Sequence, residues 1–198
     1  QMCIRDRLVI EATQVCGGSS GLNGGGVRQQ FSSPLNIELA RRTVKWLEAS
    51  TASGELNCDY HQTGYMFIAR NKFTEEGLKQ GIDIQNSFDV PTRWLSPEEI
   101  AQVAPGVNLD GMLGAALGPT DGYLDPNTLV NHVANKAREQ GAQIVSGSPV
   151  VAMESVGNKI TQVKLGNGKS FFAEVIVNCA GAWAPEIAKL YGATLPIR

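Results

Sequence analysis

The sequence predicts a mixed α/β protein in which layered α/β structure encloses an antiparallel part. Two aliphatic runs, Leu8–Ile10 and Val175–Val177, are typical of parallel strands buried on both faces. Predicted strands alternate with predicted helices along most of the chain, which favours α/β layers. A turn signal at Asn167–Gly168 lies between two short strand-like runs and indicates a hairpin, with a type I′ turn.

Composition excludes several classes of protein. Of 198 residues, 42% are hydrophobic and 18% are charged, an ordinary globular balance. Seventeen basic and nineteen acidic residues give a net charge of -2, and no Lys/Arg run indicates a nucleic-acid surface. No apolar stretch reaches the ~18 residues of a membrane span. The four cysteines form no Cys-x-x-Cys pair and the two histidines have no partner at ligand spacing, so we expect no metal site and a cytoplasmic protein with reduced thiols.

The first strand ends in an acidic residue, Glu11. In a dinucleotide-binding βαβ unit the acid after the second strand binds the ribose, about 20 residues after a glycine fingerprint. Counting back from Glu11 puts that fingerprint before Gln1, so we expect the chain to begin inside such a unit. Residues 1–7 lack the apolar core of a signal peptide and look like translated adapter sequence, so we expect them to be non-native. An ordinary buried strand followed by a surface Glu is the alternative.

A glycine-rich loop follows at residues 17–28. Six of the 22 glycines lie between Gly17 and Gly26. Glycines let backbone N–H groups approach a phosphate or a flat ring closely, because no Cβ intervenes. Arg28, at the end of the loop, carries a planar cation that suits a carboxylate. A flexible loop without a ligand is the alternative for this segment.

Periodicity and capping signals place the remaining elements. Helices are expected over residues 34–49, 74–88, 96–104 and 125–140, with a last helix ending at Gly192. Pro34 and a capping box at Ser96 mark two of the helix starts, and Gly141 is the expected C-terminal cap of the fourth helix. Strands are expected over residues 64–69, 112–117, 142–146, 150–154, 159–165, 170–173 and 175–178.

Two further segments carry possible ligand contacts. The strand over residues 175–178 breaks at Ala180-Gly181-Ala182-Trp183, where a flat ring can lie over the carboxyl end of a parallel strand. A tight turn with Trp183 in the core is the alternative. In Asp121–Pro126 we expect Asp125 to cap a helix and Gly122 to permit a turn, and we assign no catalytic role to Asp121.

The order of these segments resembles the D-amino-acid oxidase superfamily, specifically its sarcosine oxidase β-subunit-like and glycine oxidase branch. The resemblance covers the chain after Arg7 and about the first half of a full-length member. It implies a partial Rossmann-like FAD-binding domain formed by residues 8–50 and 122–198, with an antiparallel-sheet substrate domain inserted over residues 51–121.

The resemblance also implies roles for individual residues. FAD would be contacted by a set spread over the chain: Glu11 at the adenosine ribose, Ser19 and Ser20 along the pyrophosphate and flavin passage, Asn23, Gly24, Gly25 and Gly26 along the isoalloxazine, Val150 at the adenine through its backbone, and Ala180, Gly181 and Trp183 as a second wall. Arg28 matches an arginine that lies near the flavin and pairs with a substrate carboxylate. No histidine lies between Glu11 and Arg28, so we expect noncovalent FAD.

The implied activity is oxidation of the C–N bond of a small amino acid or N-methyl amino acid, such as sarcosine, glycine or proline, by hydride transfer to the flavin. Oxygen or another carrier would take the electrons, and a place in a hetero-oligomer is open. Two alternatives remain: a 2-hydroxy-acid or glycerol-phosphate dehydrogenase of the same superfamily, and a noncatalytic flavoprotein-like subunit. An NAD-dependent Rossmann enzyme is disfavoured, because the hairpins between Glu11 and Trp183 do not continue a simple βαβ pattern.

Overall fold

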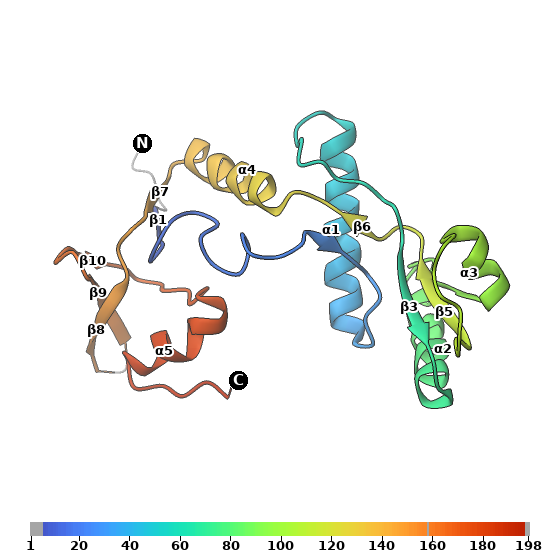
Figure 1. Ribbon diagram of the computed structural model, residues 1–198. Coiled ribbons are helices and arrows are strands. Elements are labelled where there is room, and N and C mark those ends of the chain that lie inside the picture. The colour runs from blue at the N-terminus through green and yellow to red at the C-terminus, as the bar shows by residue number, and fades with distance from the viewer. Residues whose placement is uncertain (1–5, 158, 197–198) are drawn as a thin grey trace. The chain divides into compact units, whose positions relative to one another are not determined.

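The computed structural model describes residues 6–157 and 159–196, and it divides into two compact units (Figure 1). Unit 1 holds the described residues up to Leu22 and from Val130 onward, and unit 2 holds Asn23–Leu129. These boundaries differ from the expected functional domains, which are defined by ligand binding and stay a prediction. Residues 1–5 of the segment expected to be non-native lie outside the described residues, whereas Arg7 is the first residue of β1 (Arg7–Ile10).

Unit 1 contains a parallel pair formed by two of the predicted strands. Strand β1 pairs in parallel with β7 (Ala142–Val145), from Arg7 opposite Ala142 to Ile10 opposite Val145. The chain reaches β7 from α4 (Pro126–Glu139), and Gly141 follows with a φ of 86°, a left-handed conformation that favours glycine. Both strands and the helix with its glycine cap are confirmed. The expected burial of β1 on both faces is wrong: its residues alternate between exposed and half-buried, and Val9 is 47% exposed, because β7 is the only described strand that pairs with it.

A three-stranded antiparallel sheet follows in unit 1, in the order β10-β9-β8. Its strands are β8 (Val150–Val156), β9 (Lys159–Leu165) and β10 (Ser170–Phe172). The predicted hairpin between β9 and β10 is confirmed, but the prediction of a type I′ turn is wrong. Gly168 has a φ of 84° and Asn167 does not have a positive φ, whereas a type I′ turn needs two such residues. The connection is longer, and it is closed by a hydrogen bond from Leu165 N to Lys169 O.

The prediction of a strand over residues 175–178 is wrong. The structure assigns no strand there, and Val175 and Val177 are 77% and 74% exposed. A strand forms only when a neighbour pairs with its backbone, and none of the described strands pairs with this run. The chain instead enters a 3₁₀ turn (Gly181–Trp183) and the short helix α5 (Ala184–Lys189).

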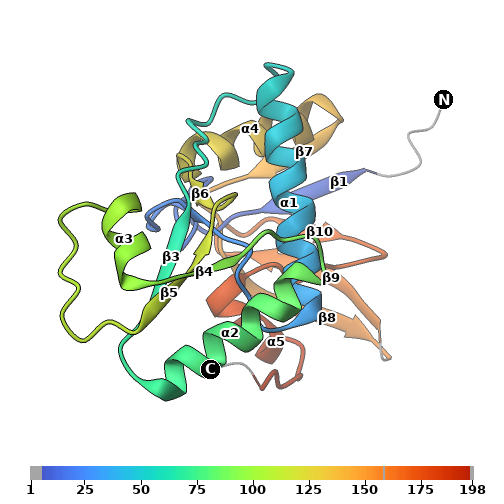
Figure 2. The same cartoon turned by 90° about the vertical axis from the view of Figure 1, so that its right-hand side faces the viewer.

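Unit 2 is built on an antiparallel sheet in the order β3-β5-β4. Its strands are β3 (Tyr65–Ala69), β5 (Gly114–Gly118) and β4 (Arg93–Leu95). Helix α2 (Lys72–Asn86) packs against all three strands, and α3 (Pro97–Val103) contacts β4 and β5 (Figures 1 and 2). A core cluster of Leu95, Ile100, Met112 and Ala115 joins α3 to this sheet. The predicted antiparallel sheet within residues 51–121 is therefore present.

The longest helix, α1 (Pro34–Ala52), begins at Pro34, as predicted. Its buried face carries Ile37, Val44 and Leu47, as the helical spacing indicates. Leu47 packs in a second core cluster of unit 2 with Leu56, Cys58 and Leu124. No helix in the part of the chain that the structure describes has the length and apolarity that crossing a membrane requires.

A two-residue antiparallel ribbon supports the segment that carries Arg28. Strand β2 (Gly26–Val27) pairs with β6 (Gly122–Tyr123), Gly26 opposite Tyr123 and Val27 opposite Gly122. Gly122 is required here, because a Cβ at this position would lie 1.8 Å from His61 O. Pairs this short leave no periodicity in the sequence, so β2, β6 and the three-residue β4 were not predicted.

Candidate functional site

The predicted ligand-binding residues fall into two groups, one in each unit. In unit 1, Glu11 directly follows β1, and its backbone N–H donates to Val145 O at 2.9 Å. Its Oε1 accepts hydrogen bonds from Thr13 N at 2.9 Å and from Thr13 Oγ1 at 3.1 Å. Within the described residues the structure shows no partner for Oε2. One carboxylate oxygen is thus oriented by Thr13 and the other remains open to a ligand hydroxyl.

The segment leading into β8 lies beside Glu11. Gly147 N donates to Thr13 O at 2.6 Å, and Ser148 N donates to Glu11 O at 3.3 Å. The Ser148 side chain is buried and accepts a hydrogen bond from Asn167 Nδ2 at 2.7 Å. These contacts bring Glu11 close to the segment that precedes Val150, the first residue of β8, so two predicted FAD contacts lie in one region of unit 1. No role for Thr13 or Ser148 was predicted from the sequence.

The loop that carries Ser19 and Ser20 is a tight turn within unit 1. Gly21 N donates to Gly18 O at 3.0 Å, and Leu22 N donates to Ser19 O at 3.3 Å. Gly21 is required, because a Cβ there would lie 2.0 Å from Cys16 O. At the other side of the turn, a Cβ on Gly18 would lie 3.7 Å from the Trp183 ring. The structure therefore brings this loop next to the predicted second wall.

The segment over residues 180–183 is held by the side chain of Asn178, a residue that was predicted to lie in a strand. Asn178 Oδ1 accepts a hydrogen bond from Ala180 N at 3.2 Å, and Asn178 Nδ2 donates to Ala184 O at 2.9 Å. Gly181 has a φ of 55° and Trp183 is 52% exposed. Asn178 thus fixes the turn over residues 180–184, with the indole largely accessible. An Asn two residues before an Ala-Gly turn is an Asx-turn signal that could have revealed this role.

In unit 2 the glycine segment over residues 23–26 is held by hydrogen bonds at Gly25, whereas Gly24 and Gly26 have free space around them. Asn23 Oδ1 accepts a hydrogen bond from Gly25 N at 2.7 Å. Gly25 is buried with a φ of 72°, and Leu124 N donates to its carbonyl at 3.0 Å. By contrast, a Cβ on Gly24 or Gly26 would meet nothing within 4 Å. The backbone is therefore positioned at Gly25 and accessible at Gly24 and Gly26, as the approach of a flat ring requires.

Arg28 lines a hollow of about 270 Å³ together with Gly26, Phe31 and Tyr65. Its guanidinium carbon lies 4.8 Å from the Phe31 ring centre and 5.4 Å from that of Phe67. Every other arginine in the described residues donates a hydrogen bond or forms an ion pair, whereas Arg28 does neither. Its aromatic contacts leave the in-plane N–H groups free to bind a carboxylate.

The two residues after Arg28 are hydrogen-bonded to a buried carboxylate, Asp121, which is 0% exposed. Asp121 Oδ1 accepts hydrogen bonds from Gln29 N at 2.8 Å and Gln29 Nε2 at 3.4 Å, and Oδ2 accepts one from Gln30 Nε2 at 3.0 Å. Asp125, by contrast, caps α4 as predicted and accepts hydrogen bonds from Asn127 N and Thr128 Oγ1. The structure shows that Asp121 anchors the residues after Arg28, a role the sequence did not reveal.

Burial raises the pKa of Asp121 above its ordinary value of 3.8, although hydrogen bonds from Gln30 and Gln29 and the charge of Arg28 act in the opposite direction. The folded protein therefore binds this proton more tightly than the unfolded chain. The free energy of unfolding should fall as pH rises from about 4 through the folded pKa, where the buried group ionises. Urea unfolding at several pH values, compared with Asp121→Asn, measures this slope. A difference between the two proteins that does not change with pH would contradict it.

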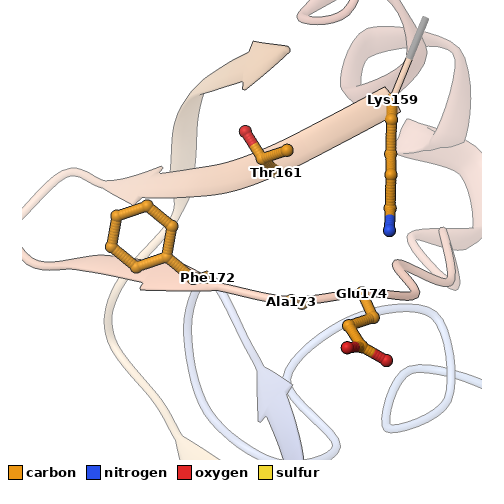
Figure 3. A pocket seen from close by; sticks show the side chains of 5 residues that line it. All are labelled: Lys159, Thr161, Phe172, Ala173 and Glu174. Carbon is orange, nitrogen blue, oxygen red and sulfur yellow. The ribbon is translucent and has the colours of Figure 1, made fainter. Parts of the chain in front are cut away.

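A second hollow, of about 320 Å³, lies on the antiparallel sheet of unit 1. Figure 3 shows Lys159 and Thr161 on β9, with Phe172, Ala173 and Glu174 on the adjoining stretch. None of these residues was predicted to bind a ligand. Among the described residues, no group of three or more His, Cys, Asp or Glu side chains is placed to hold a metal ion.

Comparison with known proteins identifies the family. The family model described as FAD dependent oxidoreductase (DAO) matches residues 5–198. The chain belongs to this family of FAD-dependent oxidoreductases. The match confirms the predicted superfamily, the class of enzyme and FAD as the cofactor.

Individual members of the family agree with this assignment. Human mitochondrial sarcosine dehydrogenase is 28% identical over 96% of this chain and 21% of its own length. A crystal structure of L-proline dehydrogenase from P. horikoshii is 28% identical, with a TM-score of 0.85 over 98% of this chain and 57% of that one. Glycine oxidase from Geobacillus kaustophilus, 22% identical, shares the fold with a TM-score of 0.80 over 95% of this chain and 52% of its own. The mixed α/β fold class is thus confirmed, and the chain spans between 21% and 57% of the length of these three proteins.

Proposed function

We propose that the protein oxidises the C–N bond of a small amino acid or N-methyl amino acid. The observation that carries this proposal is Arg28, a guanidinium that forms no ion pair with any described residue and lines a hollow beside aromatic rings. Such a group suits the carboxylate that sarcosine, glycine and proline share. Three family members are named for these same compounds, which supports the choice of substrate class.

The residues present fit FAD as the cofactor. Glu11 has an open carboxylate oxygen at the end of a parallel strand, as recognition of a ribose hydroxyl requires. In unit 2, Gly24 and Gly26 leave room where a Cβ would obstruct a flat ring. We assign the ribose to Glu11 and the isoalloxazine to residues 23–26. The remaining predicted FAD contacts are Ser19, Ser20, Val150, Ala180, Gly181 and Trp183. Attachment without a covalent bond to histidine is part of the same proposal.

In this proposal Arg28 binds the substrate carboxylate and so orients the C–N bond, while Phe31 and Tyr65 border the apolar part of the substrate. Bound FAD supplies the two-electron acceptor, so that the amine loses a hydride equivalent and becomes an imine that water hydrolyses. No general base is assigned from the described residues, because the substrate amine would react in its deprotonated form. Oxygen or another carrier would then take the electrons.

The test is the visible absorbance of the purified full-length protein before and after adding substrates without oxygen. We expect flavin bands that bleach with sarcosine, glycine or proline. Bleaching only with a 2-hydroxy acid or glycerol 3-phosphate would replace this proposal by a dehydrogenase of the same superfamily. A protein that takes up no FAD would instead favour a noncatalytic subunit.

A further inference from the structure

The position of Arg28 is not fixed by any partner of its guanidinium among the described residues. The guanidinium lies over the rings of Phe31 and Phe67. Such contacts fix the distance of a cation from the ring but let it slide parallel to the ring face. Its placement therefore depends on the backbone that carries it. On the N-terminal side that backbone is held by the β2–β6 ribbon. On the C-terminal side it is held by hydrogen bonds of Gln29 and Gln30.

These hydrogen bonds converge on one carboxylate. All three hydrogen bonds that the structure shows to the Asp121 side chain come from Gln29 and Gln30, the two residues directly after Arg28. Gln30 Nε2 also donates to Tyr65 O at 2.8 Å, which joins the same network to a residue that lines the hollow. Asp121 is fully buried and forms no ion pair within the described residues.

A buried carboxylate without an ion pair is costly, so its retention needs a compensating interaction. Here a set of donors together with the positive charge of Arg28 offsets part of this cost, although burial still leaves the pKa of Asp121 raised. The site is also shaped around this side chain, because a Cβ on Gly118 would lie 2.5 Å from Asp121 Oδ2. Packing, hydrogen bonds and charge therefore all relate Asp121 to the Arg28 segment.

We propose that Asp121 is a positioning residue for Arg28, which holds residues 29 and 30 so that the guanidinium stands at the hollow in the geometry that a small carboxylate substrate needs. This inference rests on the proposed function of Arg28. It adds a residue that touches neither substrate nor cofactor. Tyr65 is reached only through its backbone carbonyl, which β3 also holds in the sheet, so the effect on binding should pass through Arg28 and be specific to carboxylate ligands.

The key variant is Asp121→Asn in the full-length protein with FAD. The new amide N–H₂ group opposes Gln30 Nε2, so the Gln30 side chain must rotate and give up its hydrogen bond to Tyr65 O. Calorimetric titration with pyrrole-2-carboxylate and with the uncharged pyrrole-2-carboxamide measures the consequence without turnover. We expect the Kd of the carboxylate to rise about tenfold, since small misplacements of a binding group weaken recognition, and the Kd of the amide to stay unchanged.

Two controls separate positioning from general damage. Asp125→Asn makes the same chemical change four residues away at a helix cap, where Asn and Asp are equivalent, and should leave both Kd values unchanged. Gln30→Met removes the hydrogen bond to Asp121 Oδ2 while the carboxylate remains, and should raise the Kd of the carboxylate alone by a smaller factor. If Asp121→Asn fails to fold, Gln30→Met decides the question.

A double-variant comparison isolates the path through Arg28. In an Arg28→Met background, Asp121→Asn should cause no further change in the Kd of the carboxylate. An equal loss in both backgrounds, an equal loss for the amide, or an unchanged carboxylate Kd in both Asp121→Asn and Gln30→Met would overturn the positioning role. An Arg28→Met protein that binds the carboxylate as tightly as the wild type would instead overturn the proposed function of Arg28, and the positioning role with it.

Discussion

Arg28→Met should lower kcat/KM for the amine substrate about 100-fold, equivalent to about 3 kcal/mol of lost transition-state binding. Methionine keeps most of the length and the apolar contact with Phe31, but it removes every donor that a carboxylate could use. The expected loss is at the lower end for a charge pair, because Arg28 is exposed in the described structure. Steady-state kinetics of the full-length protein would measure it.

How the loss in kcat/KM divides between KM and kcat shows at which stage Arg28 acts. If Arg28 holds the carboxylate equally in the ground state and the transition state, KM rises and kcat stays nearly constant. Arg28→Lys should recover part of the loss, because a lysine restores charge but not the planar pair of donors. Arg42→Met on α1 is the matched control, since that arginine is exposed and paired with Glu38. Unchanged kinetics in Arg28→Met would remove the residue from the substrate site.

Gly25→Ala is expected to lower the free energy of unfolding by about 3 kcal/mol or more, as overpacking and backbone strain combine. A Cβ at this position would lie 2.0 Å from Leu124 O, which belongs to the backbone and cannot move alone. The φ of 72° adds a separate cost for any L side chain. Denaturant unfolding of the full-length protein would measure the loss, and FAD uptake should weaken in parallel if residues 23–26 contact the ring.

Gly54→Ala separates the two causes. Gly54 has a similar φ of 75°, but a Cβ there would meet nothing within 4 Å. Its substitution should therefore cost only the left-handed backbone strain of about 1–2 kcal/mol. Equal losses at the two positions would show that the contact with Leu124 O relaxes freely, and the clamp at Gly25 would lose its explanation.

Much of the fold could be predicted because its signals are local. Pro34 and the Ser96 capping box mark the starts of two helices, and Gly141 marks the end of another, each through the conformation or hydrogen bond of a single residue. The strand expected at residues 175–178 failed for the opposite reason. An aliphatic run states that a segment prefers extended structure, but pairing depends on a neighbour that the local sequence does not specify.

The residues of the candidate site likewise include some that could be predicted from local signals and some that could not. The order of motifs indicated the glycine loop and Arg28, since glycines and a planar cation have a direct chemical meaning. The roles of Asp121 and Asn178 were not predicted, because each depends on donors whose placement only the fold determines. Asp121 and Gln29 lie 92 residues apart, and no spacing rule connects them.

That separation also sets the order in which the molecule assembles. The pairing of β3, β5 and β4 is complete once Gly118 has been made, whereas the Arg28 segment needs Asp121–Leu124 before it can close. At about 5–20 residues per second, a ribosome makes Arg28 several seconds before the residues that anchor it. Long-range closures of this kind are slow and come late. The binding hollow is therefore expected to form last in unit 2, after the sheet beside it, so the nascent chain would carry Arg28 for seconds before it has a binding site.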